Sequence, residues 1–246
     1  MKKQIVITDL TRMYRGNVCI AGYDKDRIAV RPVLPPPGIS ESSLFYDDKP
    51  IIFPFAVVEF DFTQANPQPP HTEDYRYDPN SIRFIRIVLN RKTVLEWSLF
   101  ESVGAIFEQP IQSGPGYYVL DCQGPRSLGT IQPIEITGFI YESGEEDTWD
   151  YRLRFKDRQG DFYKLKITDL AWQYYCHSLL SHDRDRIKIT SELTTILRSS
   201  ITYLRIGLAR GWKKFPDRCY LQITGIYTFP DYLKGKTFAD YLSHQT

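Results

Sequence analysis

The stretch that decides the fold of this chain is residues 149–167, which read WDYRLRFKDRQGDFYKLKI. In Trp149–Lys156, apolar and basic side chains alternate, so that each set lies on one face of an extended strand. The turn-forming residues 157–160, DRQG, come next, and Phe162–Ile167 repeats the alternation. The stretch therefore predicts a β-hairpin with one apolar face and one charged, solvated face.

The sequence on both sides extends this hairpin into a five-stranded pattern. Asp169 is placed to cap a helix over Leu170–Leu180. The other elements predicted in the second half are strands at 131–141, 201–209 and Arg218–Phe229 and a second helical segment at 191–199. Five strands with a helix between the third and the fourth are the order expected of an OB barrel.

The first half of the chain also favours short strands. β-Branched residues bounded by Gly, Pro and Asp predict strands, and apolar residues at four-residue spacing predict a helix. The predicted strands are 4–10, 18–23, 27–33, 51–62, 81–89 and Tyr117–Leu120, the predicted helix is 93–107, and the Pro-rich segment 66–80 is a predicted loop. We expect a mostly β protein with a few helices, built as two tandem OB-like small β-barrels, with domains at 1–128 and 129–246.

The composition argues against several classes of protein. Lys and Arg outnumber Asp and Glu by only one, so the overall charge predicts no polyanionic partner. The four cysteines are scattered without Cys-x-x-Cys spacing, which favours free thiols over a zinc site. The sequence shows neither a signal peptide nor a run of about 18 apolar residues. We therefore expect a cytoplasmic protein that does not associate with membranes and binds no metal ion or cofactor.

Several blocks of the sequence resemble the dual OB-fold domain family of bacterial proteins. These blocks are 5–11, 19–22 (CIAG), 31–33 (RPV), 70–74 (PHTED), 204–210 (LRIGLAR) and 219–230 (CYLQITGIYTFP). The last block is the most specific, because it combines many distinct residue types. The resemblance extends over nearly the whole chain and implies two OB-like barrels and nucleic-acid binding, as an accessory protein of bacterial defence or nucleic-acid modification systems. It implies no catalytic residues.

Two predicted turns combine basic and aromatic side chains. In an OB barrel, the loop between the first two strands and the loop between the last two strands grip oligonucleotides. Lys and Arg neutralise phosphates, and bases stack on aromatic rings. The candidate nucleic-acid-binding residues are Arg12, Tyr14 and Arg15 in the first turn of the chain and Arg210, Trp212, Lys213 and Lys214 between the last two strands. The expected partner is single-stranded DNA or RNA, although ordinary solvated turns, with Trp212 folded back onto the barrel, would have the same composition.

Two other functions stay open. A module that docks on another protein would also show near-neutral charge and exposed aromatic side chains. An enzyme would need a cluster of reactive groups, and the best candidate is His71 with Glu73 and Asp74, because a histidine beside two carboxylates can act as a general base or bind a metal. The acidic turn 142–147 argues against a phosphate site beside it, since carboxylates repel phosphates.

Overall fold

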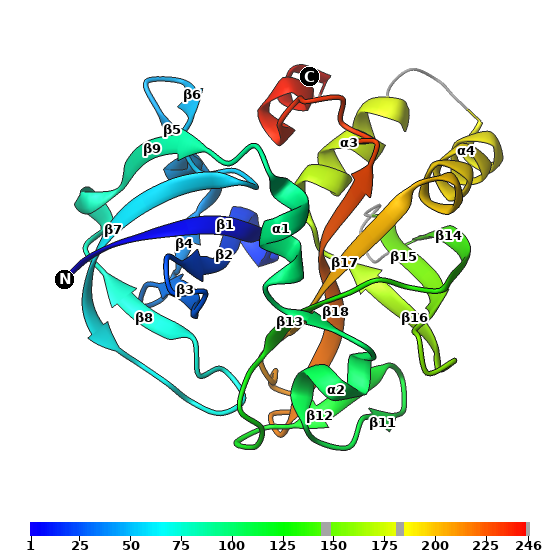
Figure 1. Ribbon diagram of the computed structural model, residues 1–246, viewed down its shortest axis with the longest axis horizontal. Coiled ribbons are helices and arrows are strands. Elements are labelled where there is room, and N and C mark those ends of the chain that lie inside the picture. Colours follow the sequence, from blue (N-terminus) through cyan, green and yellow to red (C-terminus); the bar gives the residue numbers. More distant parts are fainter. Residues whose placement is uncertain (144–148, 181–184, 245–246) are drawn as a thin grey trace.

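Strands of the first half close into a barrel, shown in blue and cyan in Figure 1. The structure is a computed structural model that describes residues 1–143, 149–180 and 185–244. The barrel strands are β1 (Lys2–Arg12), β2 (Asn17–Asp24), β3 (Ala29–Val33), β7 (Ala56–Ala65) and β8 (Asp74–Tyr77). They follow the order β1-β2-β3-β8-β7, and β7 pairs with β1 to complete the circle. β3 and β8 run parallel and the other neighbours antiparallel, as in an OB barrel.

The strand β8 lies inside the predicted loop 66–80, so that prediction is wrong for Asp74–Tyr77. The sequence pattern hides the strand because Asp74, a charged residue, occupies a buried position. Its carboxylate is neutralised by Arg31, whose Nε donates to Asp74 Oδ1 at 2.6 Å. The strand predicted at 51–62 begins only at Ala56, so its first five residues are also misassigned.

The second half has the predicted strand order of an OB barrel. Its elements are β14 (Glu135–Ser143), β15 (Trp149–Lys156), β16 (Phe162–Ile167), α3 (Leu170–Leu180), α4 (Arg186–Ser199), β17 (Ile201–Leu208) and β18 (Arg218–Phe229). The strands lie in the order β14-β15-β16-β18-β17, with β16 and β18 parallel. The hairpin at 149–167 and the helix α3 are confirmed at the predicted bounds.

The helix α4 packs against both β14 and β17 at the side of the sheet where these strands would otherwise meet. Thr194 Oγ1 accepts a hydrogen bond from Phe139 N at 3.0 Å, and Arg198 Nε donates to Ile136 O at 2.6 Å. Side chains of α4 thus form hydrogen bonds with backbone groups at the edge of β14, where a neighbouring strand would otherwise do so. No helix in the described part of the chain is long and apolar enough to cross a membrane.

The helix predicted at 93–107 is wrong as a single element. It consists of α1 (Arg91–Glu96), β10 (Leu99–Phe100) and α2 (Val103–Phe107). Ser102 begins the second helix, because its Oγ accepts a hydrogen bond from Ala105 N at 3.2 Å. The four-residue spacing reflects burial of Val103 and Phe107 in the same core rather than one continuous helix.

Segments between the two barrels pair with the second sheet. β10 runs parallel to β13 (Leu128–Ile131), β13 pairs with β17, and β12 (Tyr117–Leu120) pairs with β18. The division of the chain at residue 128 stays a prediction. The remaining elements are β4 (Ile39–Ser40), β5 (Phe45–Tyr46), β6 (Lys49–Pro50), β9 (Arg83–Ile87), β11 (Gln112–Ser113) and the 3-10 helices η1 (Tyr14–Gly16), η2 (Glu41–Leu44), η3 (Pro79–Ser81) and η5 (Phe238–His244).

A buried ion pair joins the two barrels. Arg205 of β17 is fully buried, and its Nη2 donates to Asp9 Oδ2 of β1 at 2.8 Å. The Nη1 group of Arg205 donates to Tyr23 Oη at 2.7 Å, to Ser98 Oγ at 2.8 Å and to Thr130 Oγ1 at 2.9 Å. Since a buried charge is tolerated only when it is fully paired, this network holds β1 and β17 in one arrangement.

Contacts between the barrels continue along β1. Arg12 N donates to Thr168 O at 2.8 Å, and Tyr227 Oη of β18 donates to Thr8 O at 2.8 Å. Next to this contact, Asp169 Oδ1 accepts a hydrogen bond from Ala171 N at 2.9 Å, which confirms the predicted cap of α3. The loop that follows β1 is thereby held at this junction.

Candidate nucleic-acid interface

A cavity of about 730 Å³ lies between the two barrels. Its first wall comes from β2 and β3 and includes Cys19, Arg31 and Val33. Its second wall comes from β17, β18 and the residues directly after β17, and it includes Arg210 and Gln222. In OB barrels the face formed by strands two and three carries the ligand, so the cavity lies on that face of the first barrel.

Asp74 holds two arginine side chains at this cavity, one from each half of the chain. Its Oδ1 accepts the hydrogen bond from Arg31 Nε, and its Oδ2 accepts another from Arg210 Nη2. Asp74 is completely buried, whereas the side chain of Arg210 is 48% exposed. Because one carboxylate balances only one of the two guanidinium charges, the group carries a net positive charge.

The loop after β1 brings a second set of predicted residues to the cavity. Arg12 and Tyr14 line it, and Tyr14 is 80% exposed. The guanidinium carbon of Arg15 lies 5.1 Å from the centre of the Tyr14 ring. Arg12 is less free, since it lies 4.6 Å from the centre of the Tyr174 ring. Tyr14 and Arg15 are therefore the more accessible ligands of this loop.

The loop between β17 and β18 presents an aromatic ring to solvent. Trp212 is 55% exposed, so its ring is not sealed inside the core. It meets Phe215 edge to face, with the ring centres 5.7 Å apart. The loop narrows at Gly211, where an added Cβ would lie 2.1 Å from Pro216 O, a contact that other residues cannot make. The two sides of the loop therefore approach each other closely at Gly211 and Pro216, and Trp212 lies in the part of the loop beyond this contact.

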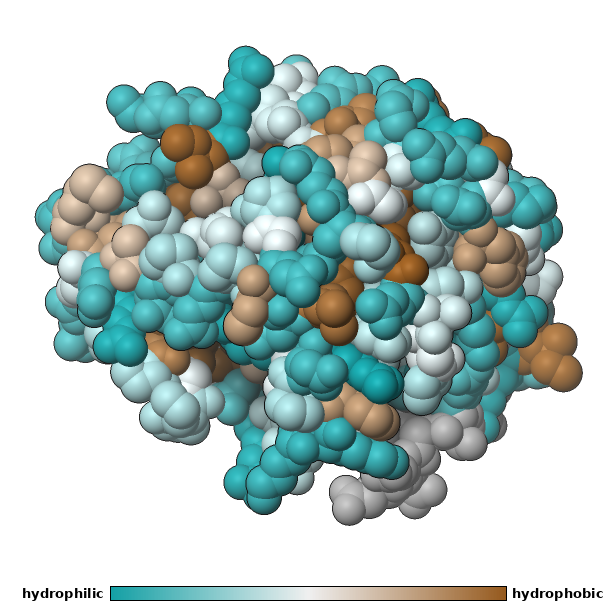
Figure 2. Space-filling model, turned by 90° about the horizontal axis from the view of Figure 1, so that it is seen from below, coloured by the Kyte–Doolittle hydropathy of each residue, from teal (hydrophilic) through white to brown (hydrophobic). Residues whose placement is uncertain are grey.

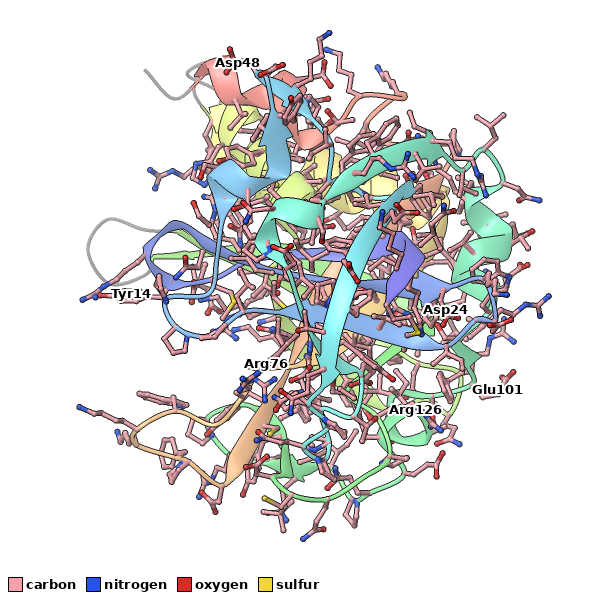
Figure 3. All side chains as sticks on the ribbon, turned by 90° about the vertical axis from the view of Figure 1, so that its left-hand side faces the viewer. Tyr14, Asp24, Asp48, Arg76, Glu101 and Arg126 are labelled. Atoms are coloured by element: carbon pink, nitrogen blue, oxygen red, sulfur yellow. The ribbon has the colours of Figure 1, made fainter. Side chains whose placement is uncertain are left out.

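The lysines of the same loop lie free in solvent. Lys213 and Lys214 are exposed and, among the residues that the structure describes, have no ion-pair partner. Lys214 Nζ lies 5.5 Å from the centre of the Phe215 ring. Figure 3 shows this loop, in faint orange, projecting on the same side of the molecule as Tyr14, with Arg76 between them. The two loops predicted from the sequence therefore flank one face.

Two arginines of this face were missed by reasoning from the sequence. Arg31 and Arg76 both line the cavity. Arg76 is exposed, and no ion pair involves it within the described residues. Arg31 lies in the block RPV, which the family resemblance already singles out. Arg76 has a weaker signal: in the stretch DYRY at 74–77, polar residues alternate with aromatic ones at the period of a strand.

The three residues proposed for catalysis make different contacts. His71 is buried, with Nε2 3.9 Å from Cys219 Sγ. Glu73 accepts hydrogen bonds from the backbone N and the hydroxyl of Ser127, at 2.7 and 3.1 Å. Asp74 pairs with the two arginines described above. Glu73 and Asp74 thus have separate structural partners, whereas Nδ1 of His71 is buried without a hydrogen-bond partner among the described residues. The described residues contain no cluster of His, Cys, Asp and Glu that could hold a metal ion.

Burial makes His71 a neutral residue of the folded protein. Desolvation, with the positive charges of Arg31 and Arg210, lowers the pKa of His71 from its ordinary 6.5 to about 2. The unfolded chain takes up a proton below pH 6.5 and the folded protein does not, so stability is lost as the pH falls. From pH 7 to pH 5, we expect the parent to lose up to about 2 kcal/mol more unfolding free energy than the variant His71→Gln. Urea unfolding at both pH values measures this difference; equal losses would contradict the assignment.

Most basic side chains on the face of the hairpin at 149–167 pair with acidic neighbours, whereas Arg154 is exposed and has no ion pair among the described residues. Arg152 Nε donates to Glu142 Oε2 at 2.8 Å, and Lys164 pairs with the other oxygen of the same carboxylate. Lys166 Nζ lies 2.6 Å from Asp150. Glu142 is the first residue of the predicted acidic turn, of which 144–147 lie outside the described residues. This face carries less free positive charge than its sequence indicates.

These observations define a class of protein: two OB barrels, joined by a buried ion pair, with basic and aromatic loops around the cavity between them. The chain belongs to the family of the dual OB-containing domain, whose family model matches residues 3–226. Nearly the whole chain is covered, which confirms the resemblance noted from its sequence blocks. None of the curated proteins compared with it matches the sequence. OB barrels are a fold that commonly binds nucleic acids.

Proposed function

We propose that this protein binds single-stranded nucleic acid across the cavity between its barrels. The observation that carries the proposal is that two loops project on the same side of the molecule (Figure 3). The first loop holds Tyr14 and Arg15, and the second holds Trp212, Lys213 and Lys214. A strand lying across this face would stack bases on the exposed rings of Tyr14 and Trp212. The cations beside the rings would neutralise its phosphates.

The charge distribution supports this proposal despite the near-neutral overall charge. Arg76, Lys213 and Lys214 have no ion-pair partner among the described residues, whereas Arg152, Lys164 and Lys166 on the hairpin face are paired. Uncompensated positive charge is therefore present beside the cavity, where a polyanion can displace bound counterions. An accessory role in a bacterial defence or nucleic-acid modification system remains part of the proposal, based on the family resemblance alone.

The face seen in Figure 2 gives less support to a protein-docking function. Figure 2 shows a face dominated by hydrophilic residues, on which apolar residues are scattered rather than gathered into one patch. Stable docking surfaces usually combine a contiguous apolar centre with a polar rim. We therefore place nucleic-acid binding before docking on a protein.

Replacing the exposed tryptophan of the second loop tests the proposal. We expect Trp212→Ala to weaken binding of a labelled single-stranded oligonucleotide about 5- to 150-fold, since stacking of one base contributes roughly 1–3 kcal/mol. Fluorescence anisotropy measures the affinity. The control is Tyr46→Ala, because Tyr46 is 69% exposed in the hairpin of β5 and β6, away from the cavity. The proposal fails if Trp212→Ala binds as well as the parent, or if Tyr46→Ala weakens binding equally.

A further inference from the structure

Arg31 is a buried cation with an unused hydrogen-bonding group. Its side chain is 6% exposed and lines the cavity. Its Nε is bound to Asp74, but its Nη2 is buried without a hydrogen-bond partner in the described structure. An unpaired buried donor costs about 1–3 kcal/mol, more when it is charged, and such groups in native proteins generally serve a ligand or water.

The charges around the cavity favour an anion. Its lining contains four arginines and two aspartates, an excess of two positive charges. Asp9 is neutralised by Arg205 and Arg12 by Glu41, and both of these partners lie outside the lining. The other aspartate, Asp74, is shared between Arg31 and Arg210. The planar guanidinium group matches phosphate geometry with two parallel hydrogen bonds, which makes arginine the usual partner of phosphate groups.

The rest of the lining suits an uncharged, partly apolar group. The segment after β3 supplies Leu34, Pro35, Pro36 and Pro37 to the cavity, and Leu208 faces it from the end of β17. Gln222 adds an amide, which can both donate and accept hydrogen bonds. The volume of about 730 Å³ falls within the range of roughly 300–1,000 Å³ that is typical of small-molecule sites. An anionic group joined to a flat heterocycle fits this combination.

From these features we infer that the cavity is a binding site for one nucleoside phosphate, with the phosphate on Nη2 of Arg31 and the base against the apolar segment after β3. This inference rests on the proposed function, which it deepens: the exposed loops bind the strand, and the cavity takes a single nucleotide unit. The same chemistry could come from a free nucleotide or from the phosphorylated end of a strand. Arg76 and Arg210 are placed to share the phosphate charge.

Isothermal titration with nucleoside 5′-monophosphates, the matching nucleosides and inorganic phosphate tests the inference. We expect at least one monophosphate to bind, and its nucleoside to bind at least 10-fold more weakly. Arg31→Lys keeps the charge beside Asp74 but removes Nη2, and it should weaken monophosphate binding at least 10-fold. Arg76→Ala changes an exposed, unpaired side chain, so it should fold normally and weaken binding several-fold. The control is Arg158→Ala, an exposed arginine that pairs with Glu101 and should leave binding unchanged.

A competition experiment distinguishes a free nucleotide from the phosphorylated end of a strand as the ligand of the cavity. It also distinguishes failure of this inference from failure of the proposed function. Displacement of a 5′-phosphorylated oligonucleotide by the monophosphate would assign the cavity to the end of a strand, and monophosphate binding without displacement would assign it to a free nucleotide. The inference is overturned if no monophosphate binds at millimolar concentration, or if both Arg31→Lys and Arg76→Ala bind like the parent. In that case, oligonucleotide binding that depends on Trp212 would still support the proposed function. Loss of that dependence would overturn the proposed function as well.

Discussion

Arg205→Leu is expected to destabilise the protein by about 3–5 kcal/mol, because it leaves the carboxylate of Asp9 buried without its cation. Asp9 is 2% exposed and Arg205 is fully buried, so water cannot replace the missing partner. Leucine also leaves the hydroxyls of Tyr23, Ser98 and Thr130 without the donor that they share. Chemical denaturation at pH 7 measures the change in unfolding free energy.

Two further variants make this prediction specific to the buried pair. Arg83→Ala removes a surface pair with Glu59, in which the arginine side chain is 66% exposed, and should cost no more than about 1 kcal/mol. The double variant Asp9→Leu with Arg205→Leu should recover part of the lost stability, since neither charge then remains buried alone. A loss for Arg205→Leu as small as that for Arg83→Ala would show that the network does not hold the barrels together.

The second large effect is expected on the salt dependence of nucleic-acid binding. The double variant Lys213→Ala with Lys214→Ala removes two exposed cations from the loop after β17. Each phosphate contact with a single strand contributes about 0.7 to the slope of log affinity against log salt concentration, so the slope should become shallower by about 1.4. At 0.1 M salt this corresponds to a loss of roughly 25-fold relative to the parent, if both proteins bind alike at 1 M.

The matched control for this variant lies at the other end of β18. Lys234→Ala with Lys236→Ala also removes two exposed lysines, but from the segment that follows Phe229. Titration of a labelled single strand at several salt concentrations gives the slope for each protein. The loop assignment is refuted if the two double variants change the slope equally, or if the slope of the Lys213 and Lys214 variant matches the parent.

The strands and the identity of the candidate loops could be predicted because local sequence encodes them. The alternation at 149–167 and the turn DRQG determine the hairpin almost to the residue. The segment from Arg210 to Arg218 was recognised as a turn because Gly211 and Pro216 interrupt two apolar runs, and its basic and aromatic side chains indicated nucleic acid. These signals depend on neighbours along the chain, so one sequence is enough to detect them.

The misassignments share a physical cause: residues distant in the sequence supply the charge or the packing contacts that decide the local structure. β8 was predicted as part of a loop because residues 66–80 are rich in proline and charge, yet the charge of Asp74 is neutralised by Arg31 and Arg210 from 43 and 136 positions away. The helix at 93–107 was predicted as one element because its apolar residues have four-residue spacing, yet Leu95 and Val103 pack in two different clusters with distant residues, and Ser102 begins a new helix between them. A pattern within one segment cannot reveal which distant side chain supplies the missing charge or backbone partner.

The sequence by itself determined a mostly β chain, the OB strand order of its second half and two turns rich in basic and aromatic residues, since periodicity and turn chemistry are local properties. The tertiary structure alone decided that these turns flank one cavity and that Arg31, Asp74 and Arg210 meet there. It also decided that Asp9 and Arg205, 196 residues apart, lock the barrels together. Those features depend on the packing of one barrel against the other, which no single stretch of the chain encodes.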